Sequence, residues 1–172
     1  MTGQLILIRH AKAEDGRVDI QRALTSRGRS DAAAIGRLLT DAEVWPELAV
    51  VSPATRARQT WQCAQAVLAA EHGTAEIVVD ERIYYNEVDA LWQVLADIAA
   101  GIGCLALVGH NPSISEFALL LDDEQGDPDA RNGLRTGYPT SGVAVFEVTG
   151  GWDALTPRAA TLRSFGVGRA PA

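Results

Sequence analysis

Cysteine is scarce in this sequence. Cys63 and Cys104 are the only two among 172 residues, and neither belongs to a CxxC pair or stands at a metal-ligand spacing from a histidine. A disulfide framework or a zinc site is therefore not expected, and a reduced, cytoplasmic setting fits best. Long apolar runs are missing as well, because residues 5–8 at the N-terminus are too few for a signal peptide or for the ~20 residues of a membrane-spanning helix.

Basic residues are outnumbered by acidic ones, with 15 Lys and Arg against 22 Asp and Glu, and the formal net charge is −7. This balance argues against a general binder of nucleic acid or of anionic membranes. Any anion that the protein handles must therefore be bound by a local cluster of cations. Hydrophobic residues make up 47% of the chain, which predicts a single globular domain over residues 1–165 and a short C-terminal tail over residues 166–172.

Short apolar runs alternate with segments of helical periodicity. The runs predict strands at residues 5–8, 48–51, 77–79, 104–108, 143–148 and 159–165. The intervening patterns predict helices, and the alternation is typical of a three-layer α/β/α sandwich with a mainly parallel central sheet.

Helix boundaries follow from the capping residues. Thr25 or Ser26 is predicted to cap the first helix, while Asn111 is predicted to cap a later one with Pro112 in its first position. Residues 122–142 are rich in Asp, Glu, Gly, Pro and Arg. We interpret them as a long functional or mobile loop inside the domain.

Potentially reactive residues follow three of the predicted strands. Arg9 and His10 end the first, the segment from Ser52 to Arg56 follows the second, and His110 follows the strand at residues 104–108. Ligands of such folds bind beyond the carboxyl ends of the strands, so these side chains are expected to meet. The sequence has no Walker motif, no nucleophilic cysteine loop, no GxSxG elbow and no grouped metal ligands. What remains is a metal-free anion pocket, in which arginines bind phosphate oxygens and a neutral imidazole accepts a phosphoryl group.

Three motifs in order resemble the histidine phosphatase superfamily: LIRHA at residues 7–11, SPATRARQT at residues 52–60 and VGHNP at residues 108–112. Ala11 stands where the family has glycine, which adds a Cβ beside the phosphate position. The short chain, together with RALT at residues 22–25, is similar to the compact SixA-like branch of phosphohistidine phosphatases. The resemblance implies a phosphoglycerate mutase-like fold.

The resemblance also implies the roles of the site residues. His10 would be the nucleophile that carries the phosphoryl group transiently, and Arg9, Arg56 and His110 would surround the phosphoryl oxygens. Arg22 either joins them or is a solvated loop charge. No cofactor and no metal would be needed. The substrate would be a phosphorylated histidine-containing protein, such as a phosphotransfer domain.

Two other functions remain open from the sequence. A phosphatase for a small phosphomonoester metabolite would need a general acid, and Glu81 occupies a place similar to that acid in ester-cleaving relatives; it could equally belong to a solvated turn. A non-catalytic phosphate-binding module is the third possibility.

Overall fold

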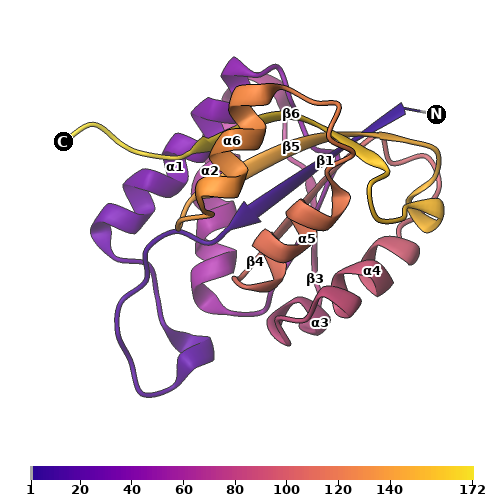
Figure 1. Cartoon of the computed structure of the whole chain (residues 1–172). Coiled ribbons are helices and arrows are strands. Elements are labelled where there is room, and N and C mark those ends of the chain that lie inside the picture. The colour runs from indigo at the N-terminus through magenta and orange to yellow at the C-terminus, as the bar shows by residue number, and fades with distance from the viewer. Residues whose placement is uncertain (1) are drawn as a thin grey trace.

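The computed structural model, which describes residues 2–172, contains a six-stranded sheet between two layers of helices (Figure 1). In spatial order the strands are β3 (Glu76–Val79), β2 (Leu48–Val51), β4 (Cys104–Gly109), β1 (Thr2–Arg9), β5 (Gly142–Thr149) and β6 (Ala160–Val167). The first four are parallel to one another, whereas β5 is antiparallel to both of its neighbours. The mainly parallel sheet predicted from the sequence is confirmed.

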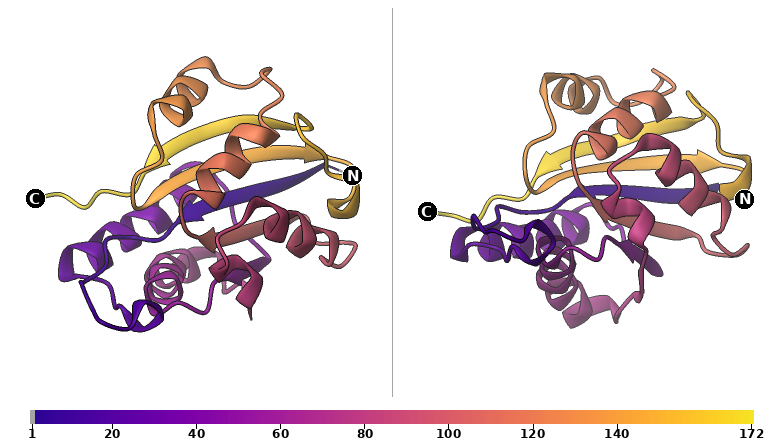
Figure 2. Two further views of the ribbon diagram at one scale, coloured as in Figure 1. Left: turned by 60° about the horizontal axis from the view of Figure 1, so that its bottom comes forward. Right: turned by 90° about the horizontal axis from the view of Figure 1, so that it is seen from below.

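Helices cover both faces of this sheet, as the edge-on view in Figure 2 shows. One face carries α1 (Ser26–Asp41) and α2 (Thr55–His72), and the other carries α4 (Val88–Ala96), α5 (Ser113–Leu121) and α6 (Pro128–Thr136). A single turn, α3 (Glu81–Tyr84), follows β3. No helix within residues 2–172 is both long enough and apolar enough to cross a membrane.

Strand β1 explains why the first apolar run has no polar residue in it. Ile6 and Ile8 pack into the core under α1 and α2, whereas Leu5 and Leu7 pack into the core on the opposite face. All four side chains are fully buried. A strand buried on both faces must be apolar at every position.

The helix that follows β4 begins differently from the prediction. α5 starts at Ser113, so Pro112 occupies the N-cap position and is not the first helical residue. Asn111 does not cap this helix, because its side-chain amide donates to the backbone oxygen of Tyr138 at 2.8 Å. The Ser113 N–H instead donates to the side-chain oxygen of Asn86 at 3.1 Å. The Thr25 cap of α1, by contrast, is confirmed by the hydrogen bond that its hydroxyl accepts from Gly28.

The predicted loop at residues 122–142 contains a helix, α6, so that prediction is wrong for its central part. Asp127 caps the helix by accepting from the Ala130 N–H at 2.8 Å, and Pro128 stands in its first turn. Only Ala130 and Leu134 are buried along it. They stand four residues apart, as on one face of a helix, but two apolar positions among polar, Gly and Pro residues were not recognised as a helix in the sequence.

The predicted C-terminal tail at residues 166–172 is also shorter than expected. β6 continues to Val167, and the residues after it contact α1. The buried carboxylate of Asp31 accepts from the Ala170 N–H at 2.9 Å and pairs with Arg27 and Arg169 at 3.0 and 3.4 Å. A buried carboxylate needs such donors, which explains why this segment is attached to the domain.

Candidate active site

A cavity of about 510 Å³ opens at the carboxyl ends of the central strands. Five of the six predicted site residues line it: Arg9, His10, Arg22, Arg56 and His110. Its other lining residues are Lys12, Ala13, Asp19, Tyr84, Asn86, Asn111 and Thr140.

Sheet register brings the two histidines together. β1 and β4 are parallel neighbours in which Arg9 lies opposite Gly109, so His10 and His110 leave the sheet at the same level. Their ring centroids are 5.1 Å apart. Arg56 reaches the same place because it lies in the first turn of α2, directly after β2.

The ring of His10 is fixed in one tautomer. Its Nδ1 lies 2.7 Å from the backbone oxygen of Ala11, and since a carbonyl can only accept, Nδ1 carries the proton. The lone pair of Nε2 therefore faces the cavity, where the Arg56 Nε–H donates to it at 3.3 Å. Burial lowers the pKa of His10 to about 4, against the opposing effect of the Ala11 hydrogen bond and with help from the charges of Arg56 and Arg9. His10 is thus neutral at pH 7.

Ala11, the departure from the family glycine, is accommodated. Its side chain is fully buried and packs with Leu24 and Ala32. Its N–H donates to the hydroxyl of Thr60 at 2.9 Å, and Thr60 in turn donates to the backbone oxygen of Arg56. The added Cβ belongs to a small apolar cluster beneath the cavity.

His110 is buried behind His10 and is oriented by two partners. Its Nε2 lies 2.8 Å from the hydroxyl oxygen of Ser52, and its Nδ1 lies 3.4 Å from Nη2 of Arg56. A guanidinium has only N–H donors, so Nδ1 accepts and Nε2 donates to Ser52. Burial lowers the pKa of His110 to about 3, and the neighbouring His10 and Arg56 add to the effect.

Two arginines are fixed at the inner wall of the cavity. The side chain of Arg56 is only 8% exposed, and its guanidinium contacts both histidines and residue Asp19. Arg9 donates from Nη1 to the backbone oxygen of Tyr138 at 2.8 Å, while its buried Nε–H has no partner within residues 2–172. Cations held in this way are preorganised for an anion with several oxygens.

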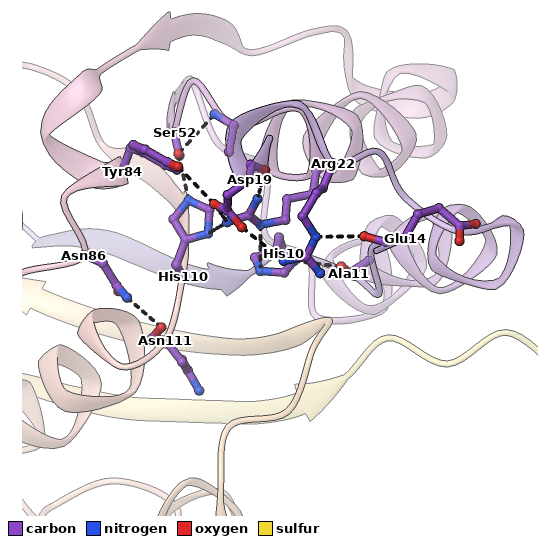
Figure 3. A network of polar contacts seen from close by, with 12 residues as sticks. His10, Ala11, Glu14, Asp19, Arg22, Ser52, Tyr84, Asn86, His110 and Asn111 are labelled. Carbon is purple, nitrogen blue, oxygen red and sulfur yellow. Dashed lines mark hydrogen bonds and ion pairs between the residues drawn. The ribbon is translucent and has the colours of Figure 1, made fainter. Parts of the chain in front are cut away.

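Asp19, Tyr84 and Asn86 also line the cavity, and the sequence analysis missed all three. Figure 3 shows Asp19 between Tyr84 and Arg22, beside both histidines. Partial burial opposes ionisation of Asp19, but hydrogen bonds from Arg56, Tyr84 and Arg22 outweigh it and lower the pKa to about 2. Tyr84 ends the single turn α3, and Asp19 and Asn86 lie in short turns. None of these segments carries a motif, so nothing in the local pattern marked them.

Arg22 lies at the cavity, where the sequence left a solvated loop charge as the alternative. Its Nη1 pairs with Asp19 Oδ1 at 3.1 Å, and its Nε donates to the backbone oxygen of Glu14 at 2.8 Å. These contacts fix the guanidinium of Arg22 at the cavity.

Glu81 does not join the other predicted residues. It is the exposed first residue of α3 and does not line the cavity. Tyr84, three residues later in the same turn, reaches the cavity instead and donates from its hydroxyl to Asp19 at 2.9 Å. The turn after β3 therefore contributes Tyr84, and no carboxylate, to the cavity lining.

The arrangement combines a neutral imidazole with fixed positive charge. Within the described residues, no three His, Cys, Asp or Glu side chains gather as potential metal ligands. Arg9, Arg22 and Arg56 surround the His10 ring, so the charge that would stabilise a transferring phosphoryl group comes from guanidinium groups. The site can bind a phosphate-like anion next to a nucleophilic nitrogen.

Comparisons with known proteins agree with this chemistry. The family model of the histidine phosphatase superfamily (branch 1) matches residues 5–89. An uncharacterized protein of Mycobacterium leprae is 32% identical over 168 residues, which cover 94% of this chain and 100% of that protein.

Among solved structures, the chain is similar to two proteins named phosphohistidine phosphatase SixA. The one from Nakamurella multipartitia has a TM-score of 0.83 at 27% identity, and the match covers 98% of this chain and 97% of that protein. The one from Agrobacterium tumefaciens has a TM-score of 0.74 at 28% identity, and the match covers 96% of this chain and 98% of that protein. The fold is the phosphoglycerate mutase-like fold. The chain belongs to the histidine phosphatase superfamily, in its SixA-like branch, and is a histidine phosphatase.

Proposed function

We propose that this phosphatase hydrolyses phosphohistidine in a protein by way of a phosphoryl group carried on His10. The observation that carries the proposal is the fixed tautomer of His10, whose Nδ1–H donates to the Ala11 carbonyl and whose Nε2 lone pair faces an arginine-lined cavity. A neutral imidazole with a directed lone pair is a competent phosphoryl acceptor.

In the first step, His10 Nε2 attacks phosphorus and the bond to the leaving group breaks. The hydrogen bond that the Arg56 Nε–H donates to Nε2 in this structure shifts to a phosphoryl oxygen, and the guanidinium keeps its proton. The proton on Nδ1 stays in its hydrogen bond to the Ala11 carbonyl, which stabilises the positive charge that develops on the ring. Arg9 and Arg22 contact the remaining oxygens, while His110, whose Nε2–H donates to Ser52, positions Arg56 through its Nδ1.

In the second step, water attacks phospho-His10. Because Nδ1 keeps its proton, the ring leaves phosphorus as a neutral imidazole, and the free enzyme is restored. The positive charge that a metal ion supplies in other phosphoryl-transfer enzymes comes here from Arg9, Arg22 and Arg56.

The substrate class is supported by the leaving group that the site can handle. An alcohol departs poorly unless an acid protonates it, whereas an imidazole is a weak base and needs little help. Glu81, the acid that a phosphomonoester phosphatase would use, lies outside the cavity lining. The similarity to proteins named SixA supports the same choice, with a histidine-containing phosphotransfer domain as the partner.

The proposal is tested with a phosphorylated histidine phosphotransfer domain. We expect release of inorganic phosphate, and an acid-free quench of the reaction should trap a phosphoenzyme at His10. His10→Ala should abolish both, whereas His72→Ala, an exposed histidine outside the cavity, should change neither. Faster turnover of an alkyl phosphate metabolite would favour the phosphomonoester alternative, and phosphate binding without any turnover would indicate a binding module.

A further inference from the structure

The Asp19 carboxylate accepts hydrogen bonds from the same arginine donors that a phosphoryl group would need. Its carboxylate accepts from Arg56 Nη2 at 3.0 Å, from Arg22 Nη1 at 3.1 Å and from the Tyr84 hydroxyl at 2.9 Å. Arg56 Nη1 also donates to the backbone oxygen of Asp19 at 2.8 Å. The carboxylate therefore stands where phosphoryl oxygens would be bound, and a phosphoryl group must displace it from the two arginines.

Asp19 can leave these donors without leaving the site. Its side chain is 52% exposed, in contrast to 8% for Arg56, and it belongs to the three-residue turn η1 (Asp19–Gln21). Displacement thus exposes little additional apolar surface. It also leaves a charged carboxylate at the open side of the cavity, where the leaving group lies if it departs in line with the His10 nucleophile.

Asp19 is the sole acidic residue among the twelve that line the cavity as described here. The other ionisable lining groups are cations, imidazoles and Tyr84, and none of the cations can accept a hydrogen bond. Asp19 is therefore the charged group of the cavity lining that can accept a hydrogen bond from an N–H of the leaving group.

We propose that Asp19 is a specificity-determining residue that selects substrates with a phosphorus–nitrogen bond over phosphate esters. This inference rests on the proposed function and extends it to the leaving group. A phosphohistidine ring that is protonated at its second nitrogen presents an N–H⁺, and the displaced carboxylate accepts it. Imidazole titrates near neutral pH, so this proton comes from solvent before binding.

The electron balance explains why this contact favours cleavage. The bond from His10 Nε2 to phosphorus forms while the bond from phosphorus to the substrate nitrogen breaks, and its electron pair returns to that nitrogen. Since the other nitrogen keeps its proton, the substrate ring leaves as a neutral imidazole. Asp19 then accepts from the second nitrogen of the leaving ring, as the Ala11 carbonyl accepts from Nδ1 of His10.

A phosphate ester gains nothing from Asp19. Its oxygen leaves with negative charge and carries no N–H, so a neighbouring carboxylate repels it. The ester also has to displace Asp19 from Arg22 and Arg56 without compensation. Removal of the charge is therefore expected to affect the two substrate classes in opposite directions.

The experiment compares Asp19→Asn with wild type on a phosphohistidine peptide and on p-nitrophenyl phosphate. We expect kcat/KM for the peptide to fall ~10-fold, as the loss of a hydrogen bond to a charged group predicts. We expect kcat/KM for the aryl phosphate to rise about 2- to 5-fold, because the arginines are released from a partly exposed ion pair. The rise also reports that the variant is folded. Asp15→Asn removes the same charge from the same loop outside the cavity and should change neither value.

The outcomes separate this inference from the proposed function. A wild-type enzyme that cleaves the aryl phosphate but not the peptide overturns both. A wild-type enzyme that cleaves the peptide, with Asp19→Asn slowing both substrates equally or leaving the peptide rate unchanged, overturns the specificity role alone.

Discussion

Arg56 contacts both histidines and Asp19 in the cavity. Its guanidinium lies against both histidines, so it can shift from Nε2 of His10 to the phosphoryl oxygens as the bond forms. A planar fork can contact two oxygens at once, which a lysine ammonium cannot reproduce.

We therefore expect Arg56→Ala to lower kcat/KM by ~10²–10³-fold, comparable to the loss of one donor from an oxyanion site. Arg56→Lys should recover little of this loss. Steady-state kinetics on one substrate measures both. Arg58→Ala is the matched control, because Arg58 is exposed on the same helix and does not line the cavity. A full recovery by lysine would show that a point charge is sufficient.

The two histidines also affect stability. Their pKa values in the folded protein are about 4 for His10 and about 3 for His110, below the ordinary value of about 6.5. Between these values the unfolded chain binds protons that the folded chain does not. The free energy of unfolding should therefore decrease as pH falls from about 6.5 toward about 4, and it should be fully retained above about 6.5.

Urea denaturation at pH 7.5 and pH 5 tests this expectation. His10→Asn should show a smaller decrease than wild type between the two pH values, because it has one such group fewer. His72→Asn should behave as wild type. The same decrease in all three proteins would mean that His10 is not held neutral by the fold.

Glu81 is the residue for which sequence position and spatial position disagree most. Because it is exposed outside the cavity, Glu81→Gln should change kcat/KM by about twofold or less on phosphohistidine, aryl phosphate and alkyl phosphate alike. A general acid would behave differently, since its loss slows an alkyl phosphate by ~10²–10⁴-fold and a better leaving group much less. Kinetics on the three substrates at one pH separates the two cases.

At the scale of elements, segments distant in sequence support the residues that line the cavity. The chain after α6 supplies the Tyr138 carbonyl that accepts from both Arg9 and Asn111, and Thr140 lines the cavity. The C-terminal segment reaches the same wall, where Arg169 donates to the backbone oxygen of Thr140 at 3.0 Å. These segments are therefore part of the support of the site.

Asp31 in α1 is the link between that helix and the C-terminal segment. Asp31→Ala should lower the free energy of unfolding by about 2 kcal/mol, because a buried carboxylate loses its hydrogen bonds to charged and backbone donors. Urea denaturation measures the change. Asp41→Ala, at the exposed end of the same helix, should have little effect. Equal stability of the two variants would contradict an anchoring role for residues 168–172.

At the scale of the whole molecule, the net charge of −7 and the cationic cavity have opposite signs. The arginines that attract a phosphoryl group repel a divalent cation. We expect activity after treatment with EDTA to stay within about twofold of the untreated enzyme, since the guanidinium groups already supply the positive charge. A loss of activity that added Mg²⁺ restores would contradict this expectation.

The layered fold and the central residues of the site could both be predicted from the sequence. Strands buried on both faces must be continuous apolar runs, and parallel strands bring Arg9, His10, Arg56 and His110 to one edge wherever the loops go. Both features follow from hydrophobic periodicity and from the residues at the strand ends, which can be read in short windows of the sequence.

The remaining cavity residues could not be predicted from the sequence, because tertiary contacts place them. Asp19, Tyr84 and Asn86 come from short turns without a motif, and Glu81 does not line the cavity although it is close to Tyr84 in sequence. α6 is stabilised by a few buried contacts with β6, and the C-terminal segment by the need of a buried carboxylate for donors. Such positions depend on long-range packing and hydrogen bonding, which no short window of residues encodes.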